Sequence, residues 1–140
     1  MSLDEEYKAL QTKMVDRKQD FLDFIAFLET KTTWLTSPAS TRYHLHEEKG
    51  LLQHSVGVTK TLLDLRALLA PQLSEECCVI VGLFHDVGKV GMPHAPRYLK
   101  EGNRFVYNTN QVEMQVAQRS LYLVSKYIPL SDDDPILFLL

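Results

Sequence analysis

The amino-acid sequence predicts an all-α fold, a helical bundle in a single domain over residues 1–140 that carries one short β-hairpin. Hydrophobic residues recur at intervals of three and four in several segments, as they do on the buried face of an amphipathic helix. Proline and glycine stand between these segments, where they favour turns. A chain of 140 residues with 45% hydrophobic and 24% charged residues has the size and composition of one compact domain.

The N-terminal part of the chain is expected to be helical and then to enter a loop. Within the first 32 residues, four hydrophobic residues share the i, i+3, i+4, i+7 spacing of a buried helix face. These residues are Phe21, Phe24, Ile25 and Leu28. Residues 36–49 are mostly polar, which favours a loop, and this loop contains Arg42, His44 and His46.

Two helices are expected in the middle of the chain. The first covers residues 50–69, where hydrophobic residues recur at helical spacing around His54. They are Leu51, Val58, Leu62, Leu65 and Leu69. The second helix is apolar over residues 77–84 and leads directly into His85 and Asp86.

Irregular structure, a hairpin and a further helix are expected after this doublet. Glycine and proline at positions 88, 91, 93 and 96 interrupt any continuous helix. Residues 97–107 predict a short hairpin, with Gly102 and Asn103 at its turn. Residues 111–128 predict a helix that buries four hydrophobic residues. These are Val116, Leu123, Val124 and Tyr127.

Charge and composition limit the classes of partner and compartment. The net charge of -3 and the isoelectric point near 5.9 argue against binding along a nucleic-acid backbone, although local cations can hold a small phosphorylated molecule. No apolar run approaches the roughly 20 residues of a membrane helix, so no membrane association is expected. The neighbouring cysteines Cys77 and Cys78 are poorly placed for an ordinary disulfide. We therefore expect a cytoplasmic protein.

His54, His85 and Asp86 are the strongest chemical signal in the sequence. Both histidines stand in or beside apolar helical segments, where an imidazole without a partner is costly to bury. Neutral imidazole and carboxylate groups are ligands of divalent first-row metals, and carboxylate also suits magnesium. A single helix histidine is more often a satisfied core or surface residue. The three residues together favour a metal site.

Several cations lie near the doublet in the sequence. Lys89 follows His85 by about one helical turn, and Arg42, Arg97 and Lys100 stand in flanking segments. Cations that converge beside a metal stabilise phosphoryl oxygens. The alternative for each of them is a solvated surface charge.

Five further residues have more than one interpretation from the sequence. His44 and His94 either bind a second metal, protonate a leaving group or take no part in the chemistry. Tyr43, Tyr98 and Tyr107 either line a pocket for a nucleobase or pack with their hydroxyl groups toward solvent.

Three segments resemble those of the HD-domain metal-dependent phosphohydrolases. Residues 51–56, Leu-Leu-Gln-His-Ser-Val, resemble the first histidine motif of that family. Residues 82–89, Gly-Leu-Phe-His-Asp-Val-Gly-Lys, resemble its His-Asp doublet motif. Residues 38–44, Pro-Ala-Ser-Thr-Arg-Tyr-His, resemble the leader of one bacterial and phage branch of uncharacterised HD hydrolases. The resemblance covers roughly residues 21–131.

The resemblance implies an HD-domain-like helical bundle that hydrolyses a nucleotide or another small phosphoester. It implies a divalent metal ion, one of Mn, Fe, Mg, Zn, Ni or Co, held by His54, His85 and Asp86. A metal-activated water would attack phosphorus, with Asp86 orienting the water. Lys89 and Arg42 would offset the charge on the phosphoryl oxygens.

The sequence also departs from the family pattern. The helix after the hairpin has Val116-Ala117 where that branch usually has a histidine-glycine pair. The closing aspartate of the family should come from a helix beyond residue 134, and residues 132–134 suit helix capping instead. We therefore expect the C-terminal end of the family domain to be missing from this chain.

Two alternatives to a hydrolase remain open. One is a catalytically impaired HD-like domain that binds a nucleotide or a protein partner without turnover. Another is a structural metal whose coordination shell is closed by a fourth ligand such as His94. The apolar residues 136–140 also suggest a homodimer, because they need either their own core or another chain to cover them.

Overall fold

The computed structural model describes residues 1–41 and 45–134, which form five α-helices and two small pairs of antiparallel strands. The helices are α1 (Leu3–Gln11), α2 (Lys18–Lys31), α3 (Gly50–Leu69), α4 (Glu75–Phe84) and α5 (Val116–Ser125). The strands are β1 (Gly91–Met92), β2 (Ala95–Pro96), β3 (Tyr98–Glu101) and β4 (Arg104–Tyr107), and a 3₁₀ turn, η1 (Val87–Val90), precedes them. The predicted all-α fold class with a short hairpin is confirmed. Arg42, Tyr43, His44 and residues 136–140 lie outside the described residues.

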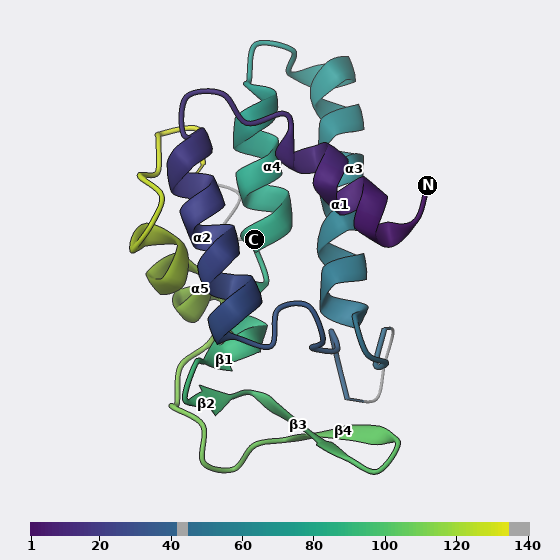
Figure 1. Cartoon of the computed structure of the whole chain (residues 1–140). Helices are drawn as coiled ribbons and strands as arrows, with labels where there is room; N and C mark the ends of the chain where they lie inside the picture. The colour runs from purple at the N-terminus through teal and green to yellow at the C-terminus, as the bar shows by residue number, and fades with distance from the viewer. Residues whose placement is uncertain (42–44, 135–140) are drawn as a thin grey trace.

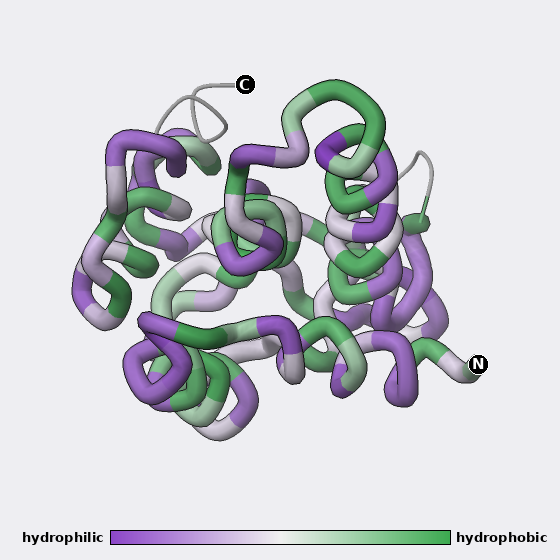
Figure 2. Tube along the Cα trace, turned by 90° about the horizontal axis from the view of Figure 1, so that it is seen from above, coloured by the Kyte–Doolittle hydropathy of each residue, from purple (hydrophilic) through white to green (hydrophobic). Residues whose placement is uncertain are grey.

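Helix α4 is the central helix of the bundle, with α3 on one side and α2 and α5 on the other (Figure 1). Its residues from Glu76 to Phe84 are all buried, which explains why this segment is almost continuously apolar. Seen along the bundle, hydrophobic residues gather toward the inside and hydrophilic residues toward the outside (Figure 2). The burial of α4 on all sides fixes the position of the residues that follow it.

Aromatic side chains form the part of the core that surrounds the end of α4. The ring of Phe84 lies 4.8 Å from that of Phe24 and 5.5 Å from that of Phe21, measured between ring centres. Trp34 is fully buried, and its ring centre is 6.1 Å from that of Phe84. Because Phe84 directly precedes His85, this packing holds the start of the His-Asp doublet in place.

The helical N-terminal region is divided into α1 and α2. Between them, the carboxylate of Glu76 on α4 accepts hydrogen bonds from the backbone N–H groups of Val15 (2.7 Å) and Arg17 (3.0 Å). These N–H groups are therefore satisfied without a continuous helix. The hydrophobic residues predicted on the second half of this region, among them Phe21 and Leu28, are buried as expected.

Two expectations for the helices are wrong in detail. The helix predicted over residues 111–128 is shorter, because α5 begins at Val116 and ends at Ser125. The segment before it is held by Arg119, which donates a hydrogen bond to the carbonyl oxygen of Val112. On α3, Leu65 and Leu69 are 46% and 77% exposed, because the last turns of this helix lie at the end of the bundle (Figure 1).

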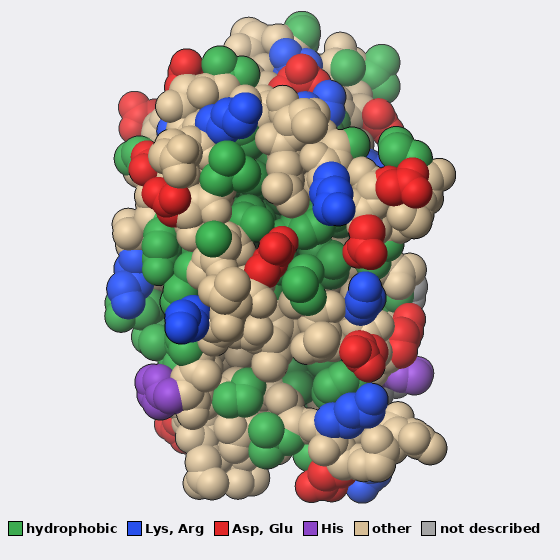
Figure 3. All heavy atoms as spheres, in the orientation of Figure 1, with side chains coloured by type: hydrophobic (Ala, Val, Ile, Leu, Met, Phe, Trp, Pro, Cys, Tyr) green, Lys and Arg blue, Asp and Glu red, His purple; other side chains and the backbone are tan. Residues whose placement is uncertain are grey.

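The β3–β4 hairpin lies at the end of the molecule toward which α4 points (Figure 1). Its first cross-strand pair is Tyr98 with Tyr107, and the turn follows Glu101. On the face shown in Figure 3, acidic and basic side chains are interspersed, without an extended area of one sign. Among the described helices, none combines the length and the hydropathy required to cross a lipid bilayer.

Candidate metal centre

The close packing of α3 against α4 brings His54 next to the doublet. At Gly82, one turn before His85, a side-chain Cβ would overlap the backbone and side chain of Thr59 on α3. Only glycine permits this approach of the two helices. Thr59 is buried, and its hydroxyl donates to the carbonyl oxygen of Ser55 in the preceding turn. The crossing point therefore places the start of α3, with His54, beside the end of α4.

His85 and Asp86 reach one point because α4 ends between them. His85 is the C-terminal cap residue of α4 and keeps helical backbone angles. Asp86 leaves the helix with φ -112° and ψ 14°, and η1 begins at the next residue. On a continuous helix two neighbouring side chains diverge by about 100°. Asp86 departs from helical backbone angles, and its Oδ2 lies 3.4 Å from Nε2 of His85, so both side chains reach the same point.

Three donor atoms face one another in this cluster. The Nε2 atoms of His54 and His85 are 3.2 Å apart, and Oδ2 of Asp86 lies 3.2 Å from the first and 3.4 Å from the second. Ligand atoms that bind one ion at about 2.0–2.2 Å are separated from each other by roughly 3–3.5 Å. The donor set therefore fits one face of a coordination shell around a divalent ion, and these residues are the group of described residues whose spacing suits a metal.

A hydrogen bond sets the tautomer of His85. Its Nδ1 lies 2.9 Å from the carbonyl oxygen of Gly82, which can only accept, so Nδ1 carries the proton. In the neutral imidazole, the lone pair is then on Nε2 and points into the cluster. This arrangement is the usual support of a metal-bound histidine.

The electrostatics of the cluster favour a positive charge at its centre. Burial alone would raise the pKa of Asp86, but hydrogen bonds with His54 and His85 and the charge of Lys89 hold that pKa well below its usual range. Burial would lower the pKa of His85, but its hydrogen bond with Asp86 and the charge of that carboxylate raise it. The same ionised carboxylate that holds a proton on His85 would attract a cation.

Lys89 is the predicted cation that the structure places at the cluster. Its Nζ is 3.6 Å from Oδ2 of Asp86 and donates a hydrogen bond of 2.8 Å to the carbonyl oxygen of Ala39. Arg42, the other cation predicted to contact phosphate, lies outside the described residues. Lys100 is exposed and pairs with Glu48 at 3.5 Å. It is a surface charge, as one of the sequence alternatives proposed.

The other two histidines that the structure describes, His46 and His94, lie apart from the three donors. His94 is exposed in the turn between β1 and β2, and it does not belong to the group of described residues with metal-ligand spacing. His46 is exposed beside Glu47. The proposal that His94 closes the shell of a structural metal therefore loses its geometric basis.

Arg119 and Ser120 of α5 clamp the backbone directly after the doublet, and the sequence interpretation did not include them. The hydroxyl of Ser120 accepts from the N–H of Gly88 at 2.9 Å, and Nη1 of Arg119 donates to the carbonyl oxygen of Gly88 at 3.1 Å. A Cβ at Gly88 would overlap the carbonyl oxygen of Val116. Arg119 and Ser120 fall at the same helical spacing as Val116, Leu123 and Val124. The periodicity of these hydrophobic residues therefore indicated that both polar side chains lie on the buried face of the helix.

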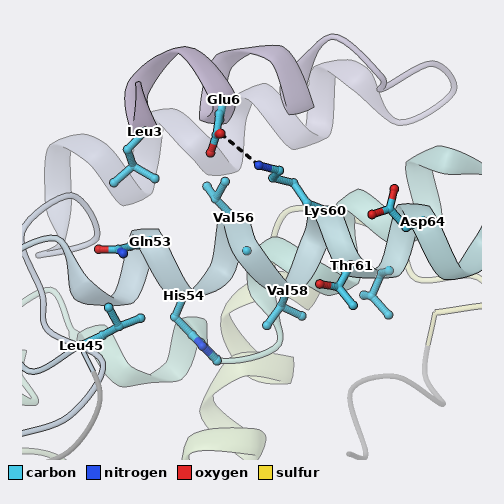
Figure 4. Close-up of a pocket in the computed structure, with 12 residues that line it drawn as sticks. Leu3, Glu6, Leu45, Gln53, His54, Val56, Val58, Lys60, Thr61 and Asp64 are labelled. Carbon is cyan, nitrogen blue, oxygen red and sulfur yellow. Dashed lines mark hydrogen bonds and ion pairs between the residues drawn. The ribbon is translucent and has the colours of Figure 1, made fainter. Parts of the chain in front are cut away.

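His54 borders a larger and a smaller pocket formed by the described residues, and these two pockets differ in their chemistry. The larger, of about 720 Å³, runs along α1 and α3. Figure 4 shows its Glu6–Lys60 ion pair on one side of α3, with the imidazole of His54 pointing away from that pair. The smaller pocket, of about 380 Å³, lies toward the hairpin and is lined by Ala39, Ser40, His54, Lys89, Arg97, Tyr98 and Tyr107. The smaller pocket is the one with the cations beside the donor atoms.

The fold and the donor group together define a helical domain with a candidate site for a divalent metal. A family model described as the HD domain matches residues 51–128, which is more than half of the chain, so the protein belongs to the HD domain family. The matched segment contains His54, His85 and Asp86 and ends after α5. Neither the curated proteins nor the solved structures contain a match to this chain. Members of this family generally bind divalent metals and are associated with phosphohydrolase activity.

Proposed function

We propose that this protein is a metal-dependent phosphohydrolase that acts on a nucleotide or another small phosphorylated molecule. The observation that carries the proposal is the convergence of Nε2 of His54, Nε2 of His85 and Oδ2 of Asp86 at mutual distances of 3.2–3.4 Å. Two imidazole nitrogens and a carboxylate oxygen at these separations have the donor types and the spacing that a divalent metal ion uses.

The three donors would hold the ion, and the identity of the metal is left open among Mn, Fe, Mg, Zn, Ni and Co. A divalent ion bound there supplies Lewis acidity, which polarises a phosphoryl oxygen and lowers the pKa of a water molecule. The described contacts of Asp86 with His54, His85 and Lys89 all involve Oδ2. Its Oδ1 is therefore the atom we assign to accept a hydrogen bond from the attacking water.

Lys89 would stabilise the phosphoryl group during the reaction. As the oxygen of water bonds to phosphorus and the ester oxygen leaves, negative charge is spread over the phosphoryl oxygens. The Lys89 ammonium lies at the cluster and is held there by the carbonyl oxygen of Ala39. Its charge is thus already oriented before substrate binds, which is the condition under which a cation lowers the barrier most. We assign Arg42 the same role on the sequence pattern alone.

Metal analysis and a hydrolysis assay test this function. Protein purified without chelators, and protein reconstituted with each of the six metals, should contain bound metal by mass spectrometry and should hydrolyse at least one of a panel of phosphoesters. His85→Ala and Asp86→Asn should lose both properties, whereas His94→Ala, which changes an exposed histidine outside the cluster, should keep them.

Metal binding and hydrolysis are measured separately, and a negative result for each has a different consequence. Absence of bound metal in every preparation would refute the metal site. Stable metal binding with no hydrolysis across the panel would refute the enzyme and favour the alternative of a domain that binds its ligand without turnover.

A further inference from the structure

The pocket beside the donor cluster has a wall of one arginine and two tyrosines whose chemistry goes beyond metal binding. Arg97, Tyr98 and Tyr107 form this wall, and the pocket also reaches Lys89 and His54. Arg97 precedes β3, and the two tyrosines are cross-strand partners at the open end of the hairpin. The hairpin and the residue before it therefore place three side chains in the same cavity as His54, although they are distant from His54 in the sequence.

Arg97 is held by the tyrosine rings instead of by a carboxylate. Its guanidinium carbon lies 5.6 Å from the ring centre of Tyr98 and 5.2 Å from that of Tyr107, and its Nε donates to the hydroxyl of Tyr98 at 3.4 Å. Within residues 1–41 and 45–134, no salt bridge pairs it with an acidic group. Its remaining N–H groups are available for an anionic oxygen.

A second arginine strengthens the positive charge behind this wall. Arg119 is completely buried and bonds only to carbonyl oxygens among the described residues, with its Nε unpaired. Burial lowers the pKa of Arg119, and the positive charge of Arg97 lowers it further. Lys89 and Arg97 both line the pocket and place two positive charges there, which favours an anion.

The exposure of the two tyrosines divides their roles. Tyr98 is 6% exposed and supports the guanidinium from within the fold, whereas Tyr107 is 52% exposed at the pocket. A half-exposed aromatic ring beside a guanidinium plane offers a stacking surface to a flat, electron-rich ring, as in the recognition of unpaired nucleobases. An aliphatic group gains much less from such a surface. The pocket volume, about 380 Å³, lies within the range for small-molecule sites.

We propose that this pocket is the leaving-group subsite. The Arg97–Tyr107 pair selects phosphoesters whose sugar carries a planar aromatic base, such as nucleoside monophosphates, over phosphoesters of sugars that carry no base. The inference rests on the proposed function, because the phosphate is directed at Lys89 and the donor cluster. Arg97 contributes to binding of the anion and of the ring, and Tyr107 contributes to binding of the ring alone.

Calorimetric titration of the full chain, both metal-free and metal-loaded, with adenosine 5′-monophosphate and ribose 5-phosphate tests the subsite. The nucleotide should bind at least about fivefold more tightly than the sugar phosphate, as expected for one stacked base. Tyr107→Leu should remove this difference and leave the affinity for ribose 5-phosphate unchanged, whereas Arg97→Gln should weaken both ligands. Proton NMR should show upfield shifts of the adenine protons with the wild-type protein, and Tyr107→Leu should abolish these shifts.

Two matched variants control for changes elsewhere on the surface. Tyr122→Leu removes a tyrosine that is 42% exposed and lies 4.9 Å from a lysine ammonium, but on α5 and outside the pocket lining. Arg104→Gln removes an exposed arginine at the turn end of β4. Both should bind like the wild type.

The inference would be overturned if the metal-free and the metal-loaded protein each bound the two ligands with equal affinity. It would also be overturned if Tyr107→Leu weakened the binding of both ligands by the same factor. Because the metal-free titration requires neither metal uptake nor turnover, failure of the proposed function is a separate result. In that case, nucleotide binding that depends on Tyr107 would persist in a protein that neither takes up metal nor hydrolyses its ligand.

Discussion

Lys89 is the residue whose charge lies both at the donor cluster and on the lining of the proposed substrate pocket. Its side chain is 23% exposed, and its Nζ lies 3.6 Å from Oδ2 of Asp86. A partly desolvated cation at this distance acts on Asp86 in the free protein, and in the proposed mechanism it would act on a phosphoryl group in the complex. Its contributions to metal binding and to turnover are therefore separable by mutation.

Lys89→Gln should lower kcat for hydrolysis by roughly 10- to 100-fold, because it removes a positive charge that is positioned for the transition state. Metal content should be retained, since the three donor atoms are unchanged. Steady-state kinetics with metal analysis of the same samples measures both effects. Lys100→Gln removes an exposed lysine and should leave kcat unchanged. Unchanged turnover in Lys89→Gln would remove this residue from the proposed mechanism.

Gly88 is a position at which one methyl group should disturb the fold. Its Cβ would overlap the carbonyl oxygen of Val116 and would lie 2.9 Å from the backbone nitrogen of Ser120. Because both obstacles include helix backbone, Gly88→Ala should destabilise the protein by roughly 1–3 kcal/mol. Gly57→Ala is the matched control, since nothing lies within 4 Å of a Cβ there, and it should stabilise α3 by up to about 1 kcal/mol. Urea denaturation measures both changes, and equal stability of the two variants would contradict the packing at Gly88.

Contacts between elements explain why α5 is part of the site although it supplies none of the three donor atoms. Ser120 and Arg119 bind the N–H and the carbonyl oxygen of Gly88 within η1, the turn that carries Lys89. The position of Lys89 therefore depends on the docking of α5. The hydrophobic stripe on α5 indicated which face is buried, but a stripe does not specify the backbone groups that it meets.

Ser120→Ala should cost roughly 1–3 kcal/mol of stability, because it leaves the buried N–H of Gly88 without a hydrogen-bond acceptor. Hydrogen exchange should show faster exchange of the Gly88 amide in particular. Ser125→Ala removes an exposed hydroxyl that donates to the carbonyl oxygen of Tyr122 in the last turn of the same helix, and it should have little effect on stability. Unaltered protection of Gly88 in Ser120→Ala would show that this contact does not hold the turn.

A buried ion network joins distant parts of the whole molecule. Arg17, between α1 and α2, pairs with Glu76 of α4 at 3.2 Å and with the fully buried Asp134 at 2.6 Å. Burial alone would raise the pKa of both carboxyl groups, but hydrogen bonds with Arg17 and with backbone N–H groups lower the pKa of each below its ordinary value. The network thus ties the N-terminal helices, the central helix and residue 134 together.

The folded protein should lose this stabilisation in acid. Because each folded-state pKa lies below the ordinary values of 4.5 for Glu76 and 3.8 for Asp134, the contribution is present above these values and is lost as pH falls through the folded-state pKa. Arg17→Met should cost roughly 3–5 kcal/mol near neutral pH, and the difference from the wild type should shrink below about pH 4. Thermal melts from pH 7 to pH 2 measure this trend.

Lys13→Met provides the control for the pH experiment. It removes the partner of Glu75 in an exposed pair, with side chains 36% and 47% accessible, so it should have little effect at any pH. A stability difference between the wild type and Arg17→Met that stays constant down to pH 2 would contradict the role of the network.

The sequence alone determined the helical class, the hairpin, the membership of the family and the three donor residues. These features depend on local spacing: hydrophobic periodicity specifies helices, and a histidine with a His-Asp doublet in apolar context is a short, specific pattern. The start of α5 at Val116 was not predictable in this way, because Arg119 and the turn before the helix decide it. Only the tertiary structure decided which cations and tyrosines face the donor cluster. The reason is physical: Arg97, Tyr107 and Lys89 reach one pocket through the crossing of α3 and α4 and the fold of the hairpin, and such long-range contacts have no period in the sequence.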